Sequence, residues 1–179
     1  MLAEADRCLP GLVSLRLDEL AGAVIDSYQE MASKHGVALH GRLTEALVSG
    51  DPLLLERLLA NLVGNAISYN EPGGWAEIEV TSQPAAVLTV SNTGPHVPAG
   101  QIERLLQPFQ HLDGARGHEH EGLGLGLSII AAIASAHDAT LSVHPRPAGG
   151  LAIEAGFRAA DAVASSPSTT TQRVSVKLP

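Results

Sequence analysis

Cysteine, aromatic and basic residues are all scarce in this chain of 179 residues. The single cysteine, Cys8, excludes an internal disulfide and favours a reducing compartment. Aromatic residues make up only 3%, so aliphatic side chains must fill the core. The 11 Lys and Arg against 19 Asp and Glu give a net charge of −8, which argues against a nucleic-acid or anionic-lipid surface. We therefore expect no nucleic-acid partner and no direct membrane contact.

Long hydrophobic runs are also lacking. Residues 1–7 carry acidic side chains and no apolar run, unlike a signal peptide. The longest uncharged stretch, residues 122–136, is too short and too rich in glycine to span a bilayer. We expect a cytoplasmic protein that reaches the inner face of the membrane only through a partner.

The chain divides into three parts by composition. Residues 1–16 contain Pro10 and Gly11 and are interpreted as a lead-in. Residues 17–158 have the hydrophobic content and length of one compact domain. Residues 159–179 are rich in Ala, Ser and Thr and are predicted to be a disordered tail.

Hydrophobic spacing predicts the secondary structure of the domain. Helices are predicted over residues 17–35, 52–69, 97–106 and 123–137, and strands over 37–43, 46–49, 75–81, 86–91, 141–144 and 151–157. Asp51 and Pro52 are typical of a helix start, a capping carboxylate followed by proline at the first helical position. Paired strands between helices favour an α+β fold, a two-layer sandwich of a mixed β-sheet packed against about three helices.

Two asparagines on the second helix are candidate ligands. Asn61 and Asn65 lie four residues apart, so they share one helix face. Amide oxygens are hard ligands that suit Mg²⁺ bridging phosphates. The alternative is a pair of partly exposed polar residues without a ligand.

A third asparagine follows the strand over residues 86–91, in the segment SNTGP. Asn92 could present both an acceptor and a donor to a flat heterocycle, and Gly94 would let the ring approach the backbone. An ordinary Asx turn is the alternative interpretation.

The most specific feature is a run of alternating glycine and leucine at the start of a helix. Free backbone amides and the helix dipole at such a position favour phosphate oxygens. The run has neither the context of a Rossmann fingerprint nor the Gly-Lys-Ser/Thr of a Walker loop. A flexible hinge before a buried helix is the alternative. The run consists of Gly122, Leu123, Gly124, Leu125, Gly126 and Leu127.

Four segments in order carry a resemblance to a known family: LLANLVGNAISYN, SNTGP, LLQPF and GLGLGLSI. Together they closely resemble the asparagine, glycine and phenylalanine boxes of the ATP-binding catalytic domain of sensor histidine kinases, within the gyrase/chaperone/histidine-kinase ATPase superfamily. The resemblance covers residues 17–157, and the segment YNEPGGW resembles the sequences of actinobacterial members of the family. It implies a Bergerat-type ATP-binding fold, with ATP and Mg²⁺ as cofactors.

The resemblance also implies roles for individual residues. Asn65 would be the Mg²⁺ ligand, with Asn61 beside it near the phosphates and Tyr69 bordering the nucleotide. Asn92 would take the place of the family's adenine-recognising aspartate, and Gly94 would allow close approach.

The remaining implied roles belong to the loop and the helix that follows. Phe109 would anchor a lid formed by residues 110–121. Gly122, Gly124 and Gly126, with the leucines between them, would line the triphosphate.

Several positions depart from the family pattern. Asn92 replaces aspartate, His96 replaces a glycine, and Ser68 replaces the usual lysine or arginine. Asn61 stands where ATP-hydrolysing relatives have a glutamate, and an amide cannot act as a general base. Hydrolysis of ATP should therefore be poor.

The implied function is a protein-histidine kinase of a two-component system. The γ-phosphate would pass to a histidine on a separate dimerisation domain or partner protein, and indirectly to a response regulator. Residues 1–16 would link to the dimerisation region. The pairs His118-Glu119, His120-Glu121 and His137-Asp138 do not lie on a predicted long dimerising helix, so the acceptor is expected elsewhere. The alternatives are a degenerate nucleotide-binding or partner-docking module and an anti-sigma-type serine kinase.

Overall fold

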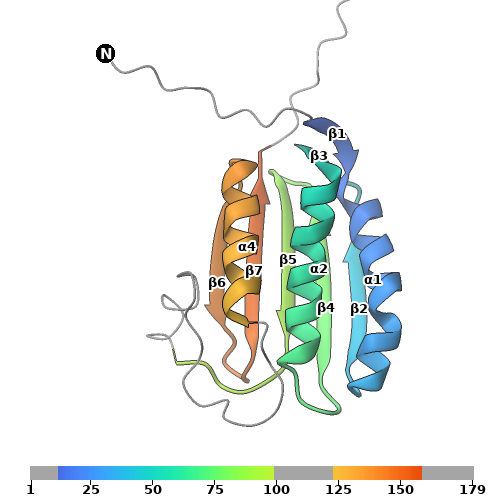
Figure 1. Cartoon of the computed structure of the whole chain (residues 1–179), viewed down its shortest axis with the longest axis vertical. Helices are drawn as coiled ribbons and strands as arrows, with labels where there is room; N and C mark the ends of the chain where they lie inside the picture. Colours follow the sequence, from blue (N-terminus) through green and yellow to red (C-terminus); the bar gives the residue numbers. More distant parts are fainter. Residues whose placement is uncertain (1–11, 99–122, 159–179) are drawn as a thin grey trace, which may run out of the picture.

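The computed structural model describes residues 12–98 and 123–158 (Figure 1). Its helices are α1 (Leu17–Lys34), α2 (Pro52–Ser68) and α4 (Leu123–Ala136). Its strands are β1 (Val13–Arg16), β2 (Ala38–Leu43), β3 (Leu47–Gly50), β4 (Trp75–Thr81), β5 (Ala86–Asn92), β6 (Thr140–Pro145) and β7 (Leu151–Phe157).

Five of the strands form one mixed sheet in the order β2-β4-β5-β7-β6. β2 pairs with β4 in parallel, and the other three pairs are antiparallel. The described helices all cover the same face of this sheet, α1 near β2, α2 over the middle and α4 near β6 and β7 (Figure 1). The predicted α+β sandwich of a mixed sheet and three helices is confirmed.

The core lies between the sheet and the helices. On β4 the side chains of Ala76, Ile78 and Val80 are buried, while Glu77 and Glu79 between them are half-exposed. This alternation places one face of the strand in the core, where removal of apolar surface from water stabilises the fold. Helix α2 contributes the largest share on the other side, with Leu55, Leu58, Leu59, Leu62, Val63, Ala66 and Ile67 all buried.

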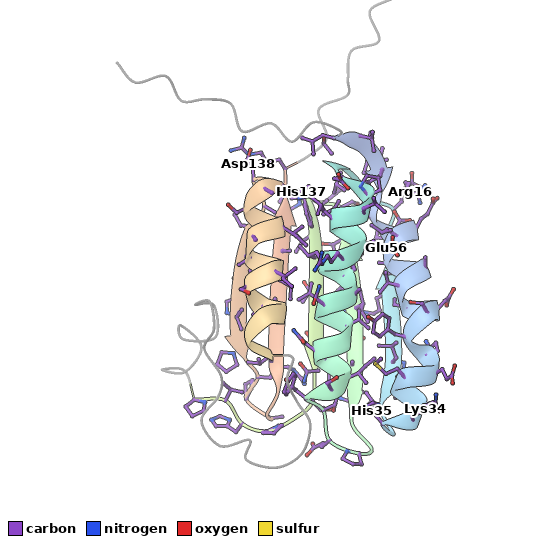
Figure 2. All side chains as sticks on the ribbon, in the orientation of Figure 1. Arg16, Lys34, His35, Glu56, His137 and Asp138 are labelled. Atoms are coloured by element: carbon purple, nitrogen blue, oxygen red, sulfur yellow. The ribbon has the colours of Figure 1, made fainter. Side chains whose placement is uncertain are left out.

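Helix α2 begins as the sequence predicts, and its start is tied to the end of α4. The Asp51 carboxylate accepts hydrogen bonds from the backbone amides of Leu53 and Leu54, at 2.9 and 3.1 Å. The buried ring of His137, labelled in Figure 2, accepts from the Asp51 amide at 3.0 Å through Nε2. Its Nδ1 then donates to the carbonyl oxygen of Ile133, at 2.8 Å. His137 therefore joins two helix ends.

One feature differs from the sequence-based predictions, and one predicted helix lies almost wholly outside the described residues. Residues 13–16, placed in the lead-in, form β1 and pair antiparallel with β3. Of the helix predicted over residues 97–106, only Val97 and Pro98 are described, and neither is helical. In the two described ranges, no helix is long and apolar enough to cross a membrane.

An ion pair fixes the junction between β1 and α1. The Arg16 guanidinium, labelled in Figure 2, donates from Nε to Asp18 Oδ1 at 2.9 Å and from Nη2 to Oδ2 at 2.6 Å. The Ala46 amide also donates to Asp18 Oδ1, at 3.0 Å. The bonds from Arg16, helped by this amide, lower the pKa of the nearly buried Asp18 carboxyl to about 2.

We expect Asp18→Asn to lower the free energy of unfolding at pH 7 by about 2 kcal/mol, because the charge-assisted bonds are lost. The folded-state pKa of about 2 lies below the ordinary value of 3.8, so the stabilisation is present above the ordinary pKa. This stabilisation is lost as the pH falls from 3.8 through the folded-state pKa of about 2.

Urea unfolding of the wild type and Asp18→Asn at pH 7 and pH 3 tests this expectation. The difference between the two proteins should be smaller at pH 3. Glu19→Gln is the matched control, because Glu19 is largely exposed and lies 3.6 Å from the same guanidinium. A loss equal at both pH values would contradict the assignment.

Candidate functional site

The C-terminal half of α2 faces the start of α4, and Asn65 lies at this contact. A Cβ built on Gly126 would lie 3.0 Å from Asn65 Nδ2 and 3.2 Å from Oδ1. The absence of a side chain at Gly126 therefore makes room for the Asn65 amide. The structure brings together the asparagine-bearing helix and the glycine-rich helix start, two segments distant in the sequence.

The Asn65 side chain is incompletely satisfied. Its Nδ2 atom is buried and has no hydrogen-bond partner among the described residues. A buried polar group without a partner costs about 1–3 kcal/mol, so such groups are typical of places where a ligand supplies the missing contact. The buried amide beside Gly126 fits a site for a polar or charged ligand.

Asn61 does not contact Asn65 through its amide nitrogen. Asn61 Nδ2 donates to the carbonyl oxygen of Arg57, one turn earlier in α2, at 2.7 Å. The sequence places both asparagines on one helix face, but they differ in environment. Asn61 Nδ2 is bonded within its own helix, whereas the Asn65 side chain faces Gly126 of α4.

Asn92 ends β5 with an oriented side chain and is 8% exposed. Its Nδ2 donates to the carbonyl oxygen of Thr93 at 2.7 Å. A carbonyl oxygen can only accept, so this bond assigns the nitrogen of the amide to Thr93. Oδ1 is then the amide atom left to accept a hydrogen bond from a donor.

Close backbone approaches surround Gly94. Its φ is +154°, and a Cβ there would lie 2.7 Å from the carbonyl oxygen of Tyr69, directly after α2. The doublet Gly149 and Gly150 before β7 has φ values of +92° and +81°. A Cβ on Gly149 would collide with the Gly94 carbonyl oxygen, and one on Gly150 with that of Asn92. Glycine is required here by both space and conformation.

A network of polar side chains that the sequence did not predict supports the backbone around Asn92 and Gly94. The Thr93 hydroxyl accepts from the Trp75 amide at 2.8 Å and donates to Asn70 Oδ1 at 2.7 Å. Asn70 Nδ2 in turn donates to the carbonyl oxygens of Ala66 and Trp75, at 3.0 and 2.9 Å. The end of α2, the start of β4 and the end of β5 are thereby joined. The available signal was Asn70 in the segment that joins the end of α2 to Gly73 and Gly74.

Some candidate residues lie beyond what the structure describes. Phe109, Gly122 and the proposed lid over residues 110–121 are outside the described residues. Leu123, Gly124 and Leu125 begin α4, but the side chains of the two leucines are not described. Leu127 is buried in the hydrophobic core.

The mixed sheet with the described helices on one face places the protein in the class of α+β sandwiches. The candidate site lies between α2, α4 and the strand ends. Residues 50–161 match the model of the histidine kinase-, DNA gyrase B- and HSP90-like ATPase family. The chain belongs to this family. Membership of an ATPase family implies that it binds ATP.

Curated relatives are similar over most of this chain. The sensor protein CutS of Streptomyces coelicolor is 41% identical over 153 residues, covering 84% of this chain and 37% of CutS. The sensor histidine kinase CusS of Escherichia coli K12 is 33% identical over 145 residues, covering 79% of this chain and 30% of CusS. The chain thus spans well under half the length of these relatives.

Solved structures show the same fold at lower identity. The catalytic domain of the histidine kinase ThkA matches with a TM-score of 0.73 at 23% identity, covering 84% of this chain and 97% of that one. The mycobacterial sensor histidine kinase MprB also has a TM-score of 0.73 at 23% identity, covering 82% and 98%.

We expect Thr93→Val to lower the free energy of unfolding by about 2 kcal/mol, because the Trp75 amide and Asn70 Oδ1 would each lose a partner. Thr93→Ser is the control, since it keeps the hydroxyl and should cost much less. Urea unfolding followed by the fluorescence of Trp75, the only tryptophan, measures both. Equal stabilities of the Val and Ser variants would argue against the network.

Proposed function

We propose that this chain is the ATP-binding catalytic part of a two-component sensor histidine kinase. The observation that carries the proposal is the buried Asn65 amide, whose Nδ2 has no partner among the described residues and which faces Gly126 at the start of α4. The family match and the relatives' names, sensor protein and sensor histidine kinase, support the same function.

In the proposed complex, the nucleotide lies between α2, α4 and the end of β5. The base is placed at Asn92, with Gly94 and Tyr69 beside it. Asn92 Oδ1 would accept from the exocyclic amine of adenine, since its Nδ2 is bonded to the backbone. The triphosphate extends toward Gly124 and Gly126, where free amides at a helix start favour phosphate oxygens.

We assign Asn65 as the Mg²⁺ ligand. Its amide oxygen is a hard donor, and Gly126 leaves space for it. Asn65 would hold the Mg²⁺, and the metal when bound would supply positive charge that stabilises the transferring phosphoryl group. The role of Asn65 is to hold the triphosphate in one position and orientation.

The reaction would form a bond between the γ-phosphorus and a ring nitrogen of the acceptor histidine. The bond between this phosphorus and the oxygen bridging to the β-phosphate breaks, and ADP leaves. In such reactions positioning and electrostatics supply most of the catalysis. Asn61 cannot act as a base toward water, because an amide does not accept a proton near neutral pH. Its nitrogen donates a hydrogen bond to the Arg57 carbonyl oxygen.

Because this chain would bind ATP and the acceptor histidine would lie elsewhere, the proposed function requires two partners. A helical-hairpin dimerisation domain would supply the histidine and an adjacent acidic residue as the base. A response regulator would then take the phosphoryl group from that histidine. The dimerisation domain belongs to the same kinase or to a separate subunit.

We expect Asn65→Ala to weaken the binding of Mg-ATP by at least about tenfold, because a metal ligand is removed. Asn65→Asp should keep Mg-dependent binding, since a carboxylate oxygen is also a hard ligand. Calorimetric titrations with Mg²⁺ and with EDTA measure the effect, and circular dichroism controls for folding. An unchanged affinity of Asn65→Ala would contradict the metal-ligand assignment.

We expect this chain alone to carry no label after incubation with γ-labelled ATP, and to phosphorylate a helical-hairpin domain that bears a histidine followed by an acidic residue. The label should be lost in acid, because phosphohistidine is acid-labile. The control partner has glutamine in place of that histidine. Acid-stable label on this chain alone would instead favour a serine kinase, and ATP binding without any transfer would favour a degenerate module.

A further inference from the structure

Arg146, in the turn between β6 and β7, contacts β4 and β5 at the end of the site where the nucleotide base is proposed to lie; this part of the site is called the base end. Its guanidinium carbon lies 4.4 Å from the centroid of the Trp75 ring, at the start of β4. Its Nη1 donates to the carbonyl oxygen of Asn92, at the end of β5, at 3.0 Å. A cation stacked on an indole ring is attracted by the ring's electron density. In the described part of the chain, Arg146 forms no salt bridge with a carboxylate.

The turn that carries Arg146 is itself fixed. The Arg146 amide donates to the carbonyl oxygen of Gly150, and the Gly149 amide donates to that of Arg146, both at 3.0 Å. The Gly150 amide donates to the carbonyl oxygen of Pro95 at 3.0 Å. The turn therefore contacts the backbone on both sides of Gly94, at Asn92 through Arg146 and at Pro95 through Gly150.

The peptide held by Arg146 also sets the orientation of a side chain. The Asn92 carbonyl accepts from Arg146, and the next carbonyl, that of Thr93, accepts from Asn92 Nδ2 at 2.7 Å. If the backbone between these two carbonyls rotates, the Asn92 amide loses its partner and can turn over. Oδ1 would then no longer be the atom presented to the base.

We propose that Arg146 is a positioning residue that determines base specificity: it fixes the Asn92 backbone against Trp75 and so keeps Oδ1 directed to a donor on the base. The inference rests on the proposed nucleotide site. Adenine carries an exocyclic amine, which donates. Hypoxanthine carries a carbonyl oxygen at that position, which would face Oδ1 as a second acceptor. The arrangement selects ATP over ITP.

The test compares the affinities of Mg-ATP and Mg-ITP for the wild type, Arg146→Ala and Arg146→Lys. The wild type should prefer ATP. In Arg146→Ala, ATP affinity should fall about tenfold while ITP affinity is kept or rises, because the freed Asn92 amide can turn over and donate from Nδ2 to the hypoxanthine carbonyl. Arg146→Lys keeps a cation and a donor and should restore part of the preference.

Two further measurements separate positioning from general stability. Arg42→Ala is the matched control, since this exposed arginine on β2 pairs with Glu79 on β4 at 2.8 Å. It should leave both affinities unchanged. The emission of Trp75 should shift in Arg146→Ala, as the stacked cation is lost, and recover partly in Arg146→Lys.

The outcomes distinguish the two proposals. If the wild type binds ATP and Arg146→Ala keeps the same ratio of ATP to ITP affinity, the positioning role is overturned and the proposed function stands. An equal loss of both nucleotides also overturns it, because that is the result of destabilisation alone. If the wild type binds neither nucleotide, the proposed function itself fails, and the inference with it.

Discussion

Helix α2 packs on the middle of the sheet between α1 and α4, and this packing sets the position of the candidate site residues. Seven of its side chains are buried, and their removal from water outweighs the cost of leaving one amide unsatisfied. With the helix held in this way, Asn65 must face Gly126, and Tyr69 must end beside Gly94. Each contact is a consequence of the rotation of α2 about its axis, which the apolar side chains determine.

The two ends of the proposed nucleotide site differ in their physical construction. The base end is held by hydrogen bonds among Asn70, Thr93 and Trp75 and by the turn that carries Arg146. The phosphate end presents the Asn65 amide and the start of α4. Under the proposed function, the hydrogen-bonded end would receive the flat base, and the buried Asn65 Nδ2 at the other end would gain a partner from the charged triphosphate.

Sequence patterns predicted the elements that have strong periodicity and not the contacts that depend on tertiary placement. α2, β4 and β7 follow directly from their spacing, and Asp51 from its place before Pro52. β1 was not predicted, because four residues show little alternation and their partner β3 follows a whole helix later. The Thr93 network and the Arg146 stack were equally hidden, since they join residues that only the folded sheet brings together. The roles assigned to Asn61, Asn65 and Asn92 stay predictions.

The strand order has a consequence for synthesis on the ribosome. β5 lies in the middle of the sheet, bonded on one edge to β4 and on the other to β7. β4 comes just before β5 in the chain, whereas β7 is the last strand described. Because translation proceeds from the N-terminus, a nascent chain that has completed β5 still has an open strand edge. That edge stays available to chaperones or to other nascent chains until residues 151–157 have emerged.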